Sequence, residues 1–136
     1  MKNKNVVVLG AGESGIGSAI LAKKKGFNVF VSDVNKIKQE VKKTLNKYSI
    51  SYEDGKHSSF NEDNVDLIIK SPGISNESDI IKSLKSNKMK IISEIEFASK
   101  YTDSTIIGIT GSNGKTTTTI LTYEILKRAG LNVEIA

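Results

Sequence analysis

The strongest constraint on the fold is a glycine-rich segment in the last third of the sequence, Gly108-Ile-Thr-Gly-Ser-Asn-Gly-Lys-Thr-Thr-Thr-Thr119. It overlaps the apolar run Thr105–Ile109 and continues into a helical pattern that extends to Gly130. In a strand, loop and helix of this kind, backbone N–H groups converge on an anion, a lysine neutralises terminal phosphates, and a threonine hydroxyl binds Mg²⁺. The segment therefore predicts a loop that binds a nucleoside triphosphate, in which Lys115 neutralises the terminal phosphates and Thr116 binds Mg²⁺.

The loop departs from the general phosphate-loop pattern at one position. That pattern has glycine five places before Gly114, where this sequence has Ile109. The alternative interpretation is a glycine-rich turn that only caps a helix. The combination of strand, Gly-x-x-Gly-Lys-Thr-Thr core and helix favours phosphate binding.

A second glycine-rich turn lies near the amino end. The buried-type strand Asn5–Leu9 runs into Gly10-Ala-Gly-Glu-Ser-Gly15, a helical pattern covers 16–25, and the strand Phe27–Asp33 ends in an acid. This order fits the dinucleotide-binding fingerprint, which predicts a nucleotide or nucleotide-sugar site but does not specify the nucleotide. Asp33 is predicted to contact a ribose hydroxyl or to cap the next helix, and the two roles are compatible.

The remaining patterns predict further α/β elements. Another buried-type strand, Val65–Lys70, leads into Ser71-Pro-Gly-Ile-Ser75, which is either a second wall of the nucleotide pocket or only a structural turn. Ser93-Glu-Ile-Glu96 has the form of a helix-start capping box. The other expected elements are helices over 36–47 and 77–86, a short edge strand over 49–52, a polar loop over 53–64, and strands over 89–92, 105–109 and 131–135.

These patterns predict two domains in an α/β fold. Residues 1–93 form a Rossmann-like parallel-sheet domain, and residues 94–136 form the first strand, loop, helix and strand of a phosphate-loop ATPase domain. Too few residues follow Lys115 to complete that domain's sheet or to supply its second Mg²⁺-binding acid. We therefore expect the amino-terminal part of a longer enzyme, inactive by itself.

Composition narrows the functional classes. The sequence has no cysteine and one histidine, His57, so thiolate and histidine-cluster metal sites are excluded, and His57 is expected to be a loop residue without a catalytic part. Without a long apolar run or a leader, we expect a soluble, cytoplasmic protein that does not bind membranes. The net charge of +5 comes from dispersed lysines with a single arginine, which favours anionic small ligands over nucleic acid.

Four segments together resemble the Mur ligases, the ATP-dependent amide-forming enzymes of peptidoglycan synthesis. They are Gly10-Ala-Gly-Glu-Ser-Gly-Ile-Gly17, Lys70-Ser-Pro-Gly-Ile74, Ser93-Glu-Ile-Glu96 and the 108–119 loop. The family's loop has the form Thr-Gly-x-x-Gly-Lys-Thr/Ser, which accounts for Ile109. Asn113 before Gly114 resembles the branch that adds D-glutamate to UDP-N-acetylmuramoyl-L-alanine.

The resemblance implies two ligand sites. The first domain would hold the UDP part of the substrate through Gly12, Glu13, Ser14, Asp33, Val34, Asn35, Ser71 and Gly73. The second would hold ATP through Gly111, Ser112, Asn113, Gly114, Lys115, Thr116 and Thr117, with Lys115 catalytic and Thr116 on Mg²⁺. The family often has arginine where Asn35 stands, and the neighbouring Lys36 is the candidate replacement.

The implied reaction is phosphorylation of the substrate's carboxylate by ATP, followed by attack of the D-glutamate amine on the acyl phosphate. The partners implied are these small molecules, and the parent enzyme would be a monomer. The alternatives are a sibling ligase that adds another amino acid, an NAD-binding oxidoreductase domain, which would leave Lys115 unexplained, and a non-catalytic binding module.

Overall fold

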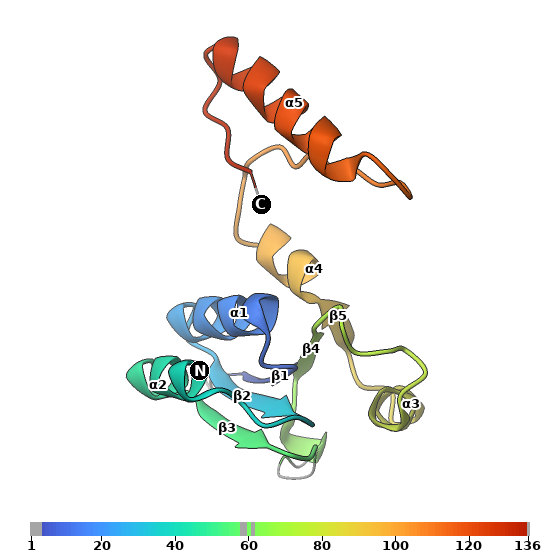
Figure 1. The fold of residues 1–136 in the computed structure, drawn as a ribbon. Coiled ribbons are helices and arrows are strands. Elements are labelled where there is room, and N and C mark those ends of the chain that lie inside the picture. Colours follow the sequence, from blue (N-terminus) through green and yellow to red (C-terminus); the bar gives the residue numbers. More distant parts are fainter. Residues whose placement is uncertain (1–3, 58–59, 61, 136) are drawn as a thin grey trace. The chain divides into compact units, whose positions relative to one another are not determined.

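The computed structural model describes residues 4–57, 60 and 62–135. Residues 58, 59 and 61, in the expected polar loop, lie outside the described part of the chain. The chain divides into two compact units, Met1–Thr102 and Asp103–Ala136, and each is described by itself (Figure 1).

The first unit contains a five-stranded parallel sheet in the order β3-β2-β1-β4-β5. The chain runs outward from the central β1 to one edge and then returns to build the other side from β4. This reversal creates a crevice beyond the carboxyl ends of the strands, where open α/β sheets bind ligands. The strands are β1 (Asn5–Leu9), β2 (Asn28–Asp33), β3 (Ser51–Asp54), β4 (Leu67–Lys70) and β5 (Ile91–Ser93).

The central strand β1 is buried on both faces because helices cover both sides of the sheet. Val6 and Val8 pack into a cluster that includes residues of α1 (Glu13–Lys24), α2 (Gln39–Lys47) and α4 (Glu94–Ser99). Val7 and Leu9 pack on the opposite face with α3 (Asp79–Ser86). The unbroken apolar sequence of β1 is what this environment requires, so the predicted Rossmann-like sheet is confirmed.

Two helices begin at other residues than the patterns predicted. Helix α1 starts at Glu13, before the expected position 16, so its first turn reaches the glycine turn. Helix α2 starts at Gln39, after the expected position 36, because Ile37 is buried and its backbone N–H donates to Asp54 Oδ2 at 3.1 Å. That side-chain bond holds the backbone of Ile37 outside the helix.

Helix α4 belongs to the first unit. The predicted capping box is present, since Ser93 Oγ accepts from the Glu96 N–H at 3.1 Å. Phe97 is buried between Phe27 and Tyr101, with ring centroids 6.0 and 5.1 Å apart. The compact unit therefore extends to Thr102, beyond the boundary at Ser93 that the sequence suggested.

The second unit contains one helix, α5 (Lys115–Arg128), at the predicted place. The strands predicted over 105–109 and 131–135 are wrong, because neither segment forms a strand. A strand needs hydrogen-bonded neighbours, and the described residues of this unit offer none. Four apolar residues of this segment are exposed: Ile120, Leu121, Ile125 and Ala129.

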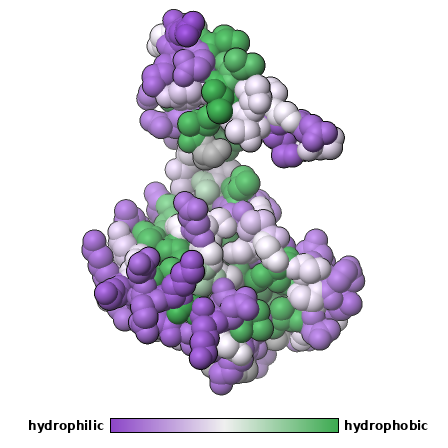
Figure 2. Space-filling model, viewed as in Figure 1, coloured by the Kyte–Doolittle hydropathy of each residue, from purple (hydrophilic) through white to green (hydrophobic). Residues whose placement is uncertain are grey.

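Exposed apolar side chains therefore gather on the second unit, as Figure 2 shows along the segment that carries α5. No helix in the described ranges is both long enough and apolar enough to cross a lipid bilayer.

Candidate functional site

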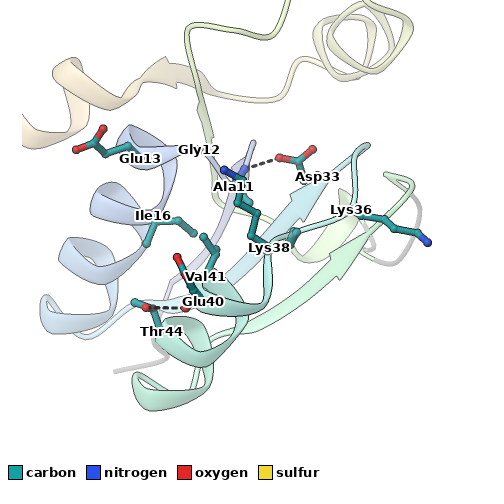
Figure 3. Close-up of a pocket in the computed structure, with 11 residues that line it drawn as sticks. Ala11, Gly12, Glu13, Ile16, Asp33, Lys36, Lys38, Glu40, Val41 and Thr44 are labelled. Carbon is teal, nitrogen blue, oxygen red and sulfur yellow. Dashed lines mark hydrogen bonds between the residues drawn. The ribbon is translucent and has the colours of Figure 1, made fainter.

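A pocket of about 550 Å³ lies beyond the carboxyl ends of β1 and β2 (Figure 3). This volume falls within the usual range for small-molecule sites. One side is formed by the glycine turn and the start of α1, and the other by the segment after β2 and the start of α2. The lining residues are Ala11, Gly12, Glu13, Ile16, Asp33, Lys36, Ile37, Lys38, Glu40, Val41 and Thr44.

Two glycines of the first turn have different constraints. A Cβ on Gly15 would lie 2.0 Å from the Gly10 carbonyl oxygen and 2.8 Å from Ser71 Oγ, so packing alone requires glycine there. A Cβ on Gly12 would meet nothing within 4 Å. Gly12 is also the N-cap of α1, where no side chain caps the free N–H groups. Open space above an uncapped helix start is an arrangement that admits an anion.

Asp33 connects the two sides of the pocket. Its Oδ2 accepts from the Ala11 N–H at 2.7 Å, and its Oδ1 accepts from the Asn35 N–H at 2.8 Å. The carboxylate is therefore not the cap of α2, which begins further along at Gln39. Val34 and Asn35 are exposed and do not line the pocket.

The turn after β4 packs against the glycine turn. Ser71 is buried, its N–H donates to the Leu9 carbonyl at 3.0 Å, and its Oγ donates to the Gly10 carbonyl at 3.4 Å. The Lys70 ammonium donates to the Ile74 carbonyl at 2.8 Å. The structural role proposed for this turn is thus observed. Ser71 and Gly73 are not among the residues that line the pocket, and neither is Ser14.

The rim opposite the glycine turn was not identified from the sequence. Asp54 holds this rim, since it binds the Ile37 N–H and pairs with the Lys42 ammonium at 2.6 Å. The hydrogen bond from Lys42, and after it the hydrogen bond from Ile37, lowers the pKa of Asp54. The hydrogen bond to Asp54 in turn raises the pKa of Lys42. The sequence analysis missed this rim because the pattern over 36–47 was interpreted as one continuous helix.

A buried polar cluster fixes the loop after β3. The fully buried Ser32 Oγ donates to Glu53 Oε1 at 2.7 Å and lies 2.6 Å from His57 Nδ1. Ser32 Oγ also lies 3.3 Å from the Lys56 carbonyl oxygen, so this hydroxyl contacts both the end of β3 and the loop that follows it. His57 lies in a loop as predicted, and here it anchors that loop to the end of β2.

The second glycine loop leads directly into α5. Gly114 is the N-cap with φ of +74°, a left-handed conformation that favours glycine, and no side chain caps the helix. The Lys115 ammonium folds back over the loop and donates to the Gly111 carbonyl at 2.6 Å. The predicted residues 111–117 are consecutive and exposed, and a glycine cap, free helix N–H groups and a lysine over the loop suit a polyphosphate.

Comparison with known proteins finds relatives of this chain. A family model described as the MurD N-terminal domain matches residues 5–80. The UDP-N-acetylmuramoylalanine--D-glutamate ligase of Bacteroides fragilis is 54% identical over 133 residues, which cover 98% of this chain. The ligase of the same name from Porphyromonas gingivalis W83 is 52% identical over 97% of this chain. The chain spans about 30% of the length of these curated relatives.

Solved structures of related ligases share the fold. A murein peptide ligase from Psychrobacter arcticus matches 94% of this chain with a TM-score of 0.68 and 26% identity, over 27% of that protein. A pseudomurein peptide ligase type C from Methanothermus fervidus matches 96% of this chain with a TM-score of 0.60 and 33% identity, over 29% of that protein.

Proposed function

This chain belongs to the family of MurD N-terminal domains, and from that membership we propose that it is the amino-terminal part of an ATP-dependent ligase that joins D-glutamate to UDP-N-acetylmuramoyl-L-alanine. The observation that carries the proposal is the 54% identity to a D-glutamate ligase over 98% of the chain. Both glycine loops lie within the compared length. A sibling ligase or an NAD-dependent oxidoreductase is not favoured by these relatives.

In this proposal, the first unit binds the UDP part of the substrate at the pocket beside the glycine turn. The free N–H groups at the start of α1 face an open space, which suits a diphosphate, and Asp33 links the glycine turn to the end of β2. Gly12, Glu13 and Asp33 line this pocket, and we propose that they contact the UDP group. The other residues implied by the family resemblance are proposed to contact parts of the UDP-sugar outside this pocket: Ser14, Val34, Asn35, Ser71 and Gly73.

The second glycine loop is proposed to bind ATP and Mg²⁺. ATP supplies the phosphoryl group that activates the substrate carboxylate. Lys115 would neutralise charge on the phosphates, Thr116 would offer its hydroxyl to Mg²⁺, and the backbone of residues 111–117 would donate N–H groups. Lys115 already lies over the loop, 2.6 Å from the Gly111 carbonyl, so it can reach a phosphate bound there by exchanging one acceptor for another.

We further propose that this chain alone does not turn over. The described residues of the second unit form one helix and no sheet, so the loop lacks the strands that position such loops in ATPase domains. The parent enzyme is also proposed to be a cytoplasmic monomer.

Ligand titration of the purified chain tests the proposal. UDP should bind and raise the thermal midpoint, because a ligand that binds only the folded state stabilises it. NAD at the same concentration should leave the midpoint unchanged. A shift with NAD and none with UDP would assign the pocket to the oxidoreductase alternative. Detectable ATP consumption by the chain alone would contradict the second part of the proposal.

A further inference from the structure

The pocket beside the glycine turn contains two lysines that differ in direction. Lys36 and Lys38 both line it. Figure 3 shows the Lys38 side chain reaching across the pocket toward the glycine turn at Ala11 and Gly12, whereas the Lys36 side chain extends away. Lys36 instead acts on Asp54, whose pKa its charge helps to lower.

The backbone that carries Lys38 is fixed. Ile37 is buried and hydrogen-bonded to Asp54, and the Lys38 carbonyl accepts the first helical hydrogen bond of α2 from the Lys42 N–H at 3.0 Å. The point at the edge of the pocket from which the Lys38 side chain extends is therefore fixed by these backbone contacts.

The charges around Lys38 leave its ammonium available. Within the described residues, no carboxylate forms an ion pair with it. Asp54 pairs with Lys42, and Asp33 accepts two backbone N–H groups. Glu13 and Glu40 also line the pocket, and neither pairs with Lys38. On the opposite side, the start of α1 presents uncapped N–H groups beside the open space at Gly12. A cation and a helix N-terminus facing the same space favour a ligand with more than one negative charge.

We propose that Lys38 binds the phosphate oxygens of the UDP group opposite the start of α1. This assignment of Lys38 rests on the proposed function. It adds a phosphate contact that the glycine-rich and serine-containing motifs in the sequence do not indicate. Lys36 has no part in it. The nucleoside half of the ligand is then expected to bind independently of Lys38.

The test measures binding of UDP and of uridine to the purified chain by calorimetry. We compare the unmodified chain with Lys38→Gln, Lys38→Arg and the control Lys43→Gln, whose side chain is exposed on α2 and does not line the pocket. Lys38→Gln should weaken UDP binding about tenfold, the usual effect of losing a hydrogen bond to a charged group. Lys43→Gln should change it less than about twofold, as expected for an exposed, screened charge. Lys38→Arg should retain most of the affinity.

Uridine separates a phosphate contact from any other effect of the substitution. Its affinity should be equal in the original chain and in Lys38→Gln. An equal loss for uridine and UDP would overturn the phosphate assignment, as would equal UDP affinities of the Lys38→Gln and Lys43→Gln variants. If the folded, unmodified chain bound no UDP, the proposed function itself would fail. That result can be distinguished from the two outcomes that would overturn only the assignment of Lys38. Thermal midpoints of all variants show whether they remain folded.

Discussion

The two glycine loops have similar local sequence patterns and different surroundings. The first follows β1, and Gly15 and Ser71 are packed against it within a sheet covered on both faces. The second precedes α5 and is fully exposed, and the apolar residues on both sides of it contact little. The helix forms in both cases, but the strand forms only in the first. A helix satisfies its own backbone hydrogen bonds, whereas a strand depends on neighbours.

The largest expected effect concerns the second loop. Lys115→Ala in the full-length parent should lower turnover by about a thousandfold or more, because the charge that stabilises phosphoryl transfer is lost. UDP binding should be unchanged, because Lys115 lies in the other unit. A steady-state assay together with UDP calorimetry measures both quantities. Activity that survived the substitution would remove the loop from the proposed site.

The two units also differ in how their apolar side chains are packed. Phe97→Ala in this chain should reduce the free energy of unfolding by about 3–5 kcal/mol, as truncation of buried aromatics does. The matched control is Ile125→Ala on α5, which is 66% exposed and should cost less than about 0.5 kcal/mol. Urea denaturation followed by circular dichroism gives both values. Similar losses for the two variants would mean that α5 is covered in solution.

Two glycines of the first loop, Gly15 and Gly12, are expected to have different roles. Gly15→Ala should destabilise the first unit by about 1–3 kcal/mol or more, since the added Cβ meets the Gly10 carbonyl. Gly12→Ala should leave stability nearly unchanged and weaken UDP binding, because the methyl group enters the space proposed for the ligand. Thermal unfolding and UDP titration of the same two proteins distinguish these roles. Normal UDP affinity in Gly12→Ala would show that no phosphate approaches that position.

The smallest expected effect concerns the rim of the pocket. The pKa of Asp54 is lowered by Lys42 and Ile37, so its contribution to stability is present above its ordinary value of 3.8 and is lost as the pH falls through the folded value. Asp54→Asn should therefore lower the thermal midpoint at neutral pH, and the difference should shrink in acid. Glu77→Gln is the control, because that side chain is 82% exposed and pairs only loosely with Lys82. A difference that stayed constant down to pH 2 would exclude this charge effect.

The first unit was largely predictable from the sequence, because its strands are short β-branched runs that alternate with helical patterns. The turn at Gly10–Gly15 and the cap at Ser93 were also predictable, because each has a short local sequence signature. The rim at Ile37 and Lys38 was not, because a hydrogen bond from Asp54, distant in sequence, sets where α2 begins. The strands around the second loop were predicted wrongly, since their residues suit a sheet that the described residues do not form.

The hydrogen bonds of Asp33 affect how the pocket binds a ligand. Its Oδ2 accepts from the Ala11 N–H, so a charge-assisted hydrogen bond joins the glycine turn to the end of β2, while its Oδ1 accepts from the nearby Asn35 N–H. A ligand that moved the glycine turn away from β2 would have to break the first of these bonds. The spacing between these two parts of the pocket is therefore set before a ligand binds.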